Sequence, residues 1–162
     1  MSDGDSGLPH FARLRIDATN PEGFVEAIRV RPERRTPTVE VDSWELGTSV
    51  DHSRSSARAV TLFQHEHLDV ITRLLGRPVA FEQTRRNLCV RGFNLEISRG
   101  RVLEIGETQL QITGRCHPCE RMEEALGAGG FVAMFGHGGW TASIVRDGTI
   151  RRGDVVRLCR DD

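Results

Sequence analysis

The sequence contains no lysine, because all 22 of its basic residues are arginine. A lysine amine is the group that forms a Schiff base with a carbonyl cofactor. The chain therefore holds no covalent pyridoxal phosphate and carries out no lysine-based imine chemistry. An arginine-biased codon usage accounts for the composition, and the chemical exclusion holds whatever its origin.

The sequence also lacks a large net charge and a long apolar run. Its formal net charge of −1 gives no electrostatic case for nucleic acid or for an anionic membrane. No apolar run approaches the length of a membrane span, and residues 1–5 lack the basic and apolar regions of a secretory signal. These absences predict a cytoplasmic protein that binds small molecules or proteins.

The composition is that of a globular protein with reduced thiols. A chain of 162 residues with 38% hydrophobic residues is long enough for one domain with a core. Its four cysteines, without a secretory signal, argue against a disulfide framework, so their chemistry matters more than crosslinking. They are Cys89, Cys116, Cys119 and Cys159.

Short alternating segments and glycine turns predict a mainly β domain, a closed or partly closed barrel with a few short helices. We expect an N-terminal arm over residues 1–22, disordered in its first seven residues, followed by the barrel over 23–162. Residues 10–16 alternate loosely, as in an edge strand or short arm. Further strands are expected over 24–30, 38–46, 59–63, 81–92, 102–106, 108–113, 141–145 and 155–159, and helices over 64–75 and 120–126.

The most reactive stretch is 113–121, which contains Cys116-His117-Pro118-Cys119 between a predicted strand and a predicted helix. A helix N-terminus and nearby arginines favour the thiolate, which is the form that acts as a nucleophile or binds metal. The alternative is that the two cysteines are simply small buried residues at a turn, since free cysteine is often buried.

The Cys116-x-x-Cys119 motif alone supports three chemistries. Structural zinc needs four ligands, and no second pair with knuckle spacing is present, so distant residues would have to complete the site. Thiol-disulfide exchange is a second possibility, although that motif normally belongs near a βαβ unit. The third is a single working thiol, Cys119, that carries sulfur or ligates a soft metal. The distant residues open to zinc are Cys89, Cys159, His52 and His137.

Other polar clusters are weaker candidates. Arg85, Arg86 and Asn87 form either an anion clamp or a solvated charge cluster. The glycine-rich loop 136–140 permits close approach of the backbone to a ligand but matches no nucleotide fingerprint. The loop 47–58 contains His52, and long loops are often functional. His65 and His67, at the start of a predicted helix, are interpreted as surface or capping residues.

Several motifs together resemble the MOSC domain, the C-terminal domain of molybdenum cofactor sulfurases, over about residues 23 to 159. The pair Pro118-Cys119, followed by the later glycine motifs, is the most specific part. The motifs are Gly23-x-Val25-x-x-Ile28, Arg31-Pro32-x-Arg34, Arg86-Asn87-Leu88-x-Val90-x-Gly92, Leu103-x-Ile105-Gly106, Cys116-x-Pro118-Cys119-x-Arg121-Met122, Gly138-Gly139-Trp140 and Gly148-x-Ile150-x-x-Gly153-Asp154.

The resemblance implies a β-barrel in which Cys119 carries sulfur or binds molybdenum, with the molybdenum cofactor (molybdopterin) held through its phosphate by basic residues. It also implies a cysteine desulfurase as sulfur donor and a metal-sulfur acceptor, or an enzyme that reduces N-hydroxylated compounds. The lack of lysine agrees with a receiver of sulfur. The pocket residues implied are Arg85, Arg86, Asn87, Gly138 and Gly139, with Arg115 and His117 flanking the thiol.

The chain departs from the family pattern at two places. Many members carry a Gly-Glu-Asn-Leu turn where this chain has Arg85-Arg86-Asn87-Leu88. Many also carry a Gly-Asp step and a His-Gly segment where this chain has Val50-Asp51-His52-Ser53. Both differences concern the expected cofactor contacts rather than the expected barrel.

Overall fold

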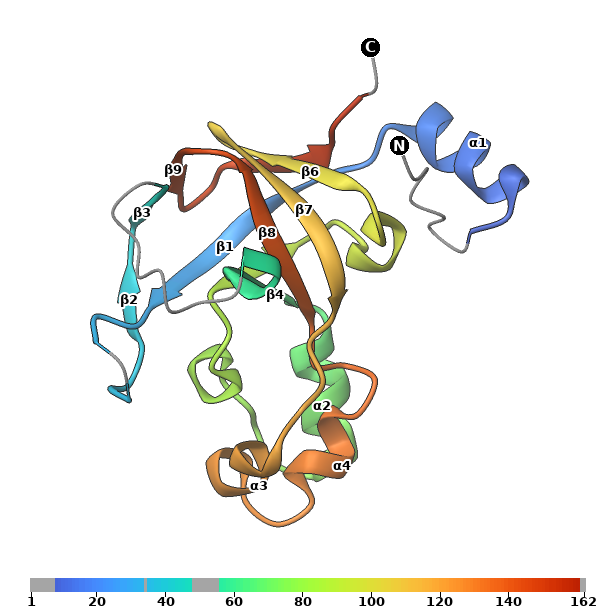
Figure 1. The fold of residues 1–162 in the computed structure, drawn as a ribbon. Helices are drawn as coiled ribbons and strands as arrows, with labels where there is room; N and C mark the ends of the chain where they lie inside the picture. Colours follow the sequence, from blue (N-terminus) through green and yellow to red (C-terminus); the bar gives the residue numbers. More distant parts are fainter. Residues whose placement is uncertain (1–7, 34, 48–55, 161–162) are drawn as a thin grey trace.

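The computed structural model of the chain describes residues 8–33, 35–47 and 56–160. Its main sheet has eight strands in the order β10-β6-β7-β8-β4-β5-β1-β2, and β3 pairs separately with β9. Because β10 also pairs with β1, the sheet closes into the predicted barrel, and β2 extends beyond β1 (Figure 1). The strands are β1 (Glu22–Val30), β2 (Val39–Val41), β3 (Ser43–Leu46), β4 (Val60–Gln64), β5 (Leu88–Arg91), β6 (Val102–Ile105), β7 (Thr108–Arg115), β8 (Trp140–Arg146), β9 (Gly148–Arg151) and β10 (Val155–Leu158).

Strands β4 and β5 are the parallel pair among the described strands, with Leu62 opposite Leu88. A parallel pair cannot be joined by a hairpin, because the chain must return to the end of the sheet from which the first strand started. Residues 65–87 make this crossover outside the barrel, through the helix α2 (His67–Leu75) and the 3₁₀ turn η2 (Phe81–Thr84). The crossover delivers Arg86 and Asn87 to the start of β5.

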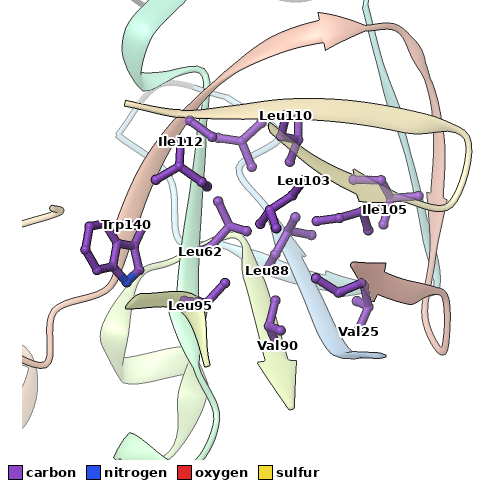
Figure 2. Packing of buried hydrophobic residues seen from close by; sticks show 14 of the residues in the cluster. Val25, Leu62, Leu88, Val90, Leu95, Leu103, Ile105, Leu110, Ile112 and Trp140 are labelled. Atoms are coloured by element: carbon purple, nitrogen blue, oxygen red, sulfur yellow. The ribbon is translucent and has the colours of Figure 1, made fainter. Parts of the chain in front are cut away.

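Consecutive residues of β4 face two different cores, as the two-residue period of a strand requires. Leu62 is buried inside the barrel, where Leu88, Leu103 and other aliphatic side chains converge (Figure 2). Phe63 is buried on the outer face of the sheet, in a second cluster that includes Ile71. The strand thereby joins the barrel to a layer of helices.

That layer consists of α2, α3 (Glu120–Leu126) and α4 (Gly130–Met134), which lie together below the barrel (Figure 1). Helix α2 ends where Gly76 adopts a left-handed conformation with φ 80°, and its N–H donates to Thr72 O. Glycine adopts this conformation without steric cost, which explains the predicted stop. No helix of the described residues is long and apolar enough to cross a membrane.

Three predicted elements differ from the observed ones. The single strand expected over 38–46 is two strands, because β2 pairs with β1 in the main sheet and β3 pairs with β9. Residues His10–Thr19 form the helix α1, so the expected edge strand over 10–16 is wrong. No α1 side chain is fully buried, and Phe11 is 69% exposed, so its apolar residues did not indicate a strand face. The strand expected over 81–92 begins only at Leu88, because η2 is held by local side-chain bonds such as Thr84 Oγ1 to Phe81 O.

Two further 3₁₀ turns, η1 (Ser56–Arg58) and η3 (Leu95–Ser98), precede β4 and β6. His52, in the long loop predicted over 47–58, and the arm expected to be disordered over 1–7 lie outside the described residues. The helix predicted over 64–75 is confirmed but begins at His67. The helix predicted over 120–126 is confirmed with those bounds.

The two cores make distinct contributions to stability that mutation of β4 can measure. We expect Phe63→Ala to lower the free energy of unfolding by about 3–5 kcal/mol and Leu62→Ala by about 2–5 kcal/mol, because each leaves a cavity in a different core. Leu74→Ala, on an α2 side chain that is 64% exposed, is the control and should change it by less than about 0.5 kcal/mol. Urea denaturation measures all three. A Phe63→Ala effect as small as the control would show that the helical layer is not packed as described.

Candidate functional site

The two thiols lie in the loop 116–119, between the end of β7 and the start of α3, as predicted. Cys116 is 4% exposed, and its N–H donates to Gly139 O at 2.8 Å. Cys119 is exposed at the position that precedes the first turn of α3, and its carbonyl accepts a hydrogen bond from Met122 N. The loop therefore presents one thiol to solvent and buries the other.

Arg86 connects this loop to the glycine-rich loop 136–139. Its guanidinium is buried and donates from Nε to Gly138 O at 2.7 Å and from Nη2 to Cys116 O at 3.5 Å. Burial lowers the pKa of Arg86, and the nearby Cys116 and Cys119 act in the opposite direction. Nη1 makes no hydrogen bond with a described residue, so this nitrogen keeps its donor capacity. Arg86 therefore clamps the loop 116–119 to the loop 136–139, and its guanidinium lies near the two thiols.

Gly138 and Gly139 serve the packing of the loops. A Cβ at Gly138 would clash with Cys116 O, and a Cβ at Gly139 would clash with Leu62 O. Gly139 also has φ +91°, which favours glycine. The space that these glycines leave is therefore filled by the protein's own backbone. Their expected role in lining a ligand pocket stays a prediction.

Asn87 and Arg85 differ in their availability, although they are neighbours of Arg86. The Asn87 side chain is buried, where its Oδ1 accepts from Thr61 N at 3.0 Å and its Nδ2 donates to Arg29 O at 3.1 Å. It holds β4, β5 and β1 together. Arg85 is exposed, in the left-handed conformation with φ 61°, and its guanidinium makes no bond with a described residue. Of the two, Arg85 is the one free to bind an anion.

Arg115 and His117 flank the loop, as expected, but they differ in the contacts that they make with the described residues. Nη2 of Arg115 donates to both carboxylate oxygens of Glu96, at 2.9 and 3.0 Å, and the guanidinium lies over the Trp140 ring at 5.0 Å from its centroid. His117 is exposed. These contacts fix Arg115 at the end of β7, and its role in holding a cofactor stays a prediction.

Sequence reasoning missed Arg58 and the contact between His67 and His137. Arg58 lies close enough to Arg86 for its charge to lower the pKa of Arg86. His67 meets His137 edge to face with ring centroids 4.8 Å apart, so it is not a surface or capping residue alone. Burial lowers the pKa of His67, and His137 lowers it further. Nδ1 of His137 is buried and has no hydrogen-bond partner among the residues that the structure describes. The histidines are far apart in sequence, and no local pattern could have joined them.

The remaining thiols do not belong to the loop. Cys89 is buried in β5, with its sulfur 3.6 Å from His65 Nδ1. Burial, together with Glu26 and Glu66, raises its pKa to about 12. Cys159 is partly exposed beside Gln109. Within the described ranges, no group of three or more His, Cys, Asp or Glu residues could hold a metal ion. The structural zinc site is therefore not formed by these residues.

Comparison with protein families and solved structures agrees with this description. Residues 49–157 match the model of the MOSC domain. The fold is similar to the YUAD protein from Bacillus subtilis, with a TM-score of 0.73, 14% identity, and coverage of 87% of this chain and 97% of that one. It is also similar to YiiM from Escherichia coli, with a TM-score of 0.66, 19% identity, and coverage of 87% and 71%. A search of curated proteins found no match.

The Arg86 clamp can be tested by substitution. We expect Arg86→Gln to lower the free energy of unfolding by about 1–3 kcal/mol, because two buried carbonyls lose their donor. The loosened loop should also make Cys116 faster to alkylate, as measured by mass spectrometry of the native protein. Arg85→Gln is the matched control and should change neither quantity. If the two variants had equal unfolding free energies and equal rates of Cys116 alkylation, the clamp by Arg86 would be contradicted.

Alkaline pH should destabilise the protein through Cys89. Its pKa is raised from about 8.5 in the unfolded chain to about 12 in the folded one, so its contribution to stability is fully present below about pH 8.5 and is lost as the pH rises towards 12. The chain has no tyrosine or lysine to titrate in this range. The free energy of unfolding should fall above about pH 8.5, and Cys89→Ala should flatten that fall. Cys159→Ala is the control, and an equal slope in the two variants would refute the assignment.

Proposed function

Because the chain belongs to the MOSC domain family, we propose that Cys119 is its working thiol, which accepts sulfane sulfur as a persulfide or ligates molybdenum. The observation that carries the proposal is the contrast within the loop 116–119. Cys119 is exposed next to the Arg86 guanidinium, whereas Cys116 and Cys89 are buried. A thiol needs both access and a positive neighbour to act as a nucleophile.

The sulfur-transfer step needs one exposed thiolate. The Cys119 thiolate attacks the outer sulfur of a donor persulfide, a new S–S bond forms at Cys119, and the donor's S–S bond breaks to release the donor thiolate. The outer sulfur of the donor persulfide is transferred to Cys119 together with its proton, so the step needs no external oxidant or reductant. Arg86 stabilises the negative charge on the loop before the attack. A second nucleophile at the metal-sulfur acceptor would later remove the sulfur.

The residues present also fit a molybdenum cofactor. A cysteine thiolate is a soft ligand suited to such a metal. Since no group of three protein ligands exists among the described residues, a metal at Cys119 must arrive with most of its ligands already bound, as a cofactor does. Arg85, His117 and Nη1 of Arg86 are the free donors that would hold an anionic part of it. When bound, the cofactor would supply two-electron reduction chemistry, for which N-hydroxylated compounds are the proposed substrates.

The proposed partners follow from the same chemistry. The chain lacks lysine and therefore cannot carry pyridoxal phosphate covalently, so a separate cysteine desulfurase would supply the sulfur. The acceptor would be a metal-sulfur centre. We propose that these exchanges take place in the cytoplasm. Cys116 would support the loop through its backbone, because its N–H and carbonyl are bound to Gly139 and Arg86.

The first experiment measures the elements bound to protein purified from a host that makes molybdenum cofactor. About one molybdenum per chain, lost in Cys119→Ser, is the result expected of a cofactor protein, since Cys119 is the protein ligand in this proposal. Protein without metal should instead gain one sulfur atom on Cys119 when incubated with a desulfurase and cysteine, as an intact-mass shift. Cys159→Ser is the matched control for both readouts.

The Cys116→Ser variant separates the proposal from a dithiol mechanism. A working thiol at Cys119 predicts that Cys116→Ser retains part of the persulfide loading or metal and that Cys119→Ser retains none. Equal loss in both variants, together with reduction of insulin by the reduced protein, would favour a CxxC thiol-disulfide oxidoreductase. Zinc in place of molybdenum at one per chain would contradict both active-thiol functions. Unchanged ligand binding in both variants would favour an anion-binding module at Arg85.

A further inference from the structure

Two histidines join the first turn of α2 to the glycine-rich loop 136–139. His67 is the first residue of α2, and His137 follows α4, the helix that packs against α2 (Figure 1). Their imidazole rings meet edge to face at an interplanar angle of 78°, with the centroids 4.8 Å apart. Both side chains are partly buried. The proposed thiol chemistry gives neither ring a role.

Neither histidine forms an ion pair with a described residue, although two carboxylates face His67. Glu66 directly precedes it, and Glu96 lies on η3. Both acids already have other partners. Glu66 accepts a hydrogen bond from Gly92 N at 2.7 Å, and Glu96 accepts from the Arg115 guanidinium at 2.9 Å. The rings therefore depend on each other for their contact, and no carboxylate bridges them within the described part of the chain.

The geometry of the pair favours two neutral rings. Two imidazolium ions in contact would repel each other. His67 also lies at the N-terminus of α2, where the helix dipole disfavours a positive charge. Burial and the neighbouring His137 lower the pKa of His67, in agreement with this. Nδ1 of His137 is buried and meets no acceptor among the described residues, so a proton there would be a buried donor without a partner.

The loop that contains His137 also covers the buried thiol. Gly139 O accepts a hydrogen bond from Cys116 N at 2.8 Å, and Gly138 O accepts from the buried Arg86 guanidinium at 2.7 Å. Cys116 is only 4% exposed in this arrangement. A displacement of His137 from α2 would pull on both of these bonds, because the two glycines directly follow it in the chain.

We propose that the pair of His67 and His137 is a pH-sensitive latch on the loop 136–139. While the rings are neutral, their contact holds the loop against α2. When both rings take up a proton, repulsion separates them, the loop loosens and Cys116 loses part of its cover. Histidine changes its charge between about pH 5 and pH 8, so mild acid opens the latch. The effect of opening on chemistry at Cys119 rests on the proposed function, whereas the latch itself does not.

Amide hydrogen exchange of the full chain, followed by NMR, tests the latch. The reporters are the amide of His137, which donates to Met134 O, and the amide of Cys116. Their protection factors, corrected for the intrinsic pH dependence of exchange, should fall about tenfold or more between about pH 7.5 and about pH 5. In His67→Phe, which keeps an aromatic ring but carries no charge, both factors should change less than about twofold over the same range.

The titration of His67 gives a second readout, which a merely structural contact would not move. The pKa of His67, followed by the NMR signals of its ring, should lie below the ordinary value for histidine. It should rise in His137→Gln, because the neighbouring like charge is removed. This measurement still tests the pair if His67→Phe fails to fold.

Two controls make the result specific. His10→Gln alters an exposed histidine on α1 and should lose protection in acid as the wild type does. Cys119→Ser should behave in the same way, which distinguishes failure of the latch from failure of the thiol function. The latch is overturned if the two amides of the wild type stay equally protected at both pH values. An equal loss of protection in His67→Phe would also overturn it, as would an unchanged titration of His67 in His137→Gln.

Discussion

The two hydrogen bonds that buried Arg86 donates to Gly138 O and Cys116 O are the constraint on which the thiol loop depends. They join three segments that are distant in sequence, and each satisfies a carbonyl that the fold has removed from bulk solvent. A buried guanidinium is costly to desolvate unless charge or dipoles compensate it. Here the carbonyls and the adjacent thiols do so. The same positive charge favours negative charge on the loop.

The loop and the helical layer beneath the barrel depend on each other. Residues 116–119 lead into α3, which packs with α2 and α4 around Phe63, on the outer face of β4. Leu62, the residue before Phe63, is in the barrel core and also contacts Gly139 through its carbonyl. The exposed thiol thus stands on a surface fixed from both sides. This rigidity distinguishes Cys119 from a cysteine that is merely accessible on a loose segment.

The sequence predicted the barrel and the thiol turn well, because both depend on local patterns. Alternation of apolar residues marked the strands, and Gly76 marked the end of α2. The sequence predicted the contacts of individual polar side chains poorly. Arg86 and Asn87 look like one polar cluster with Arg85, yet Arg85 is exposed and the other two are buried, since burial is set by the crossover from β4 to β5. The contact of His67 with His137 likewise arises from tertiary packing, which no spacing rule encodes.

The parallel pairing of β4 with β5 has a consequence for how such chains can diverge. A residue gained or lost within a barrel strand shifts its register with the neighbouring strands unless a bulge absorbs it, as the irregularity between Val25 and Ala27 in β1 does. The crossover 65–87 lies outside this ladder, so insertions and deletions between α2 and η2 leave the strand pairing intact. Such changes act on the contacts of this segment with the helical layer, where Val79 is buried and Arg77 donates to Leu126 O, and on how the chain re-enters β5. Evolution can therefore retune the chemistry of the loop while the barrel stays the same.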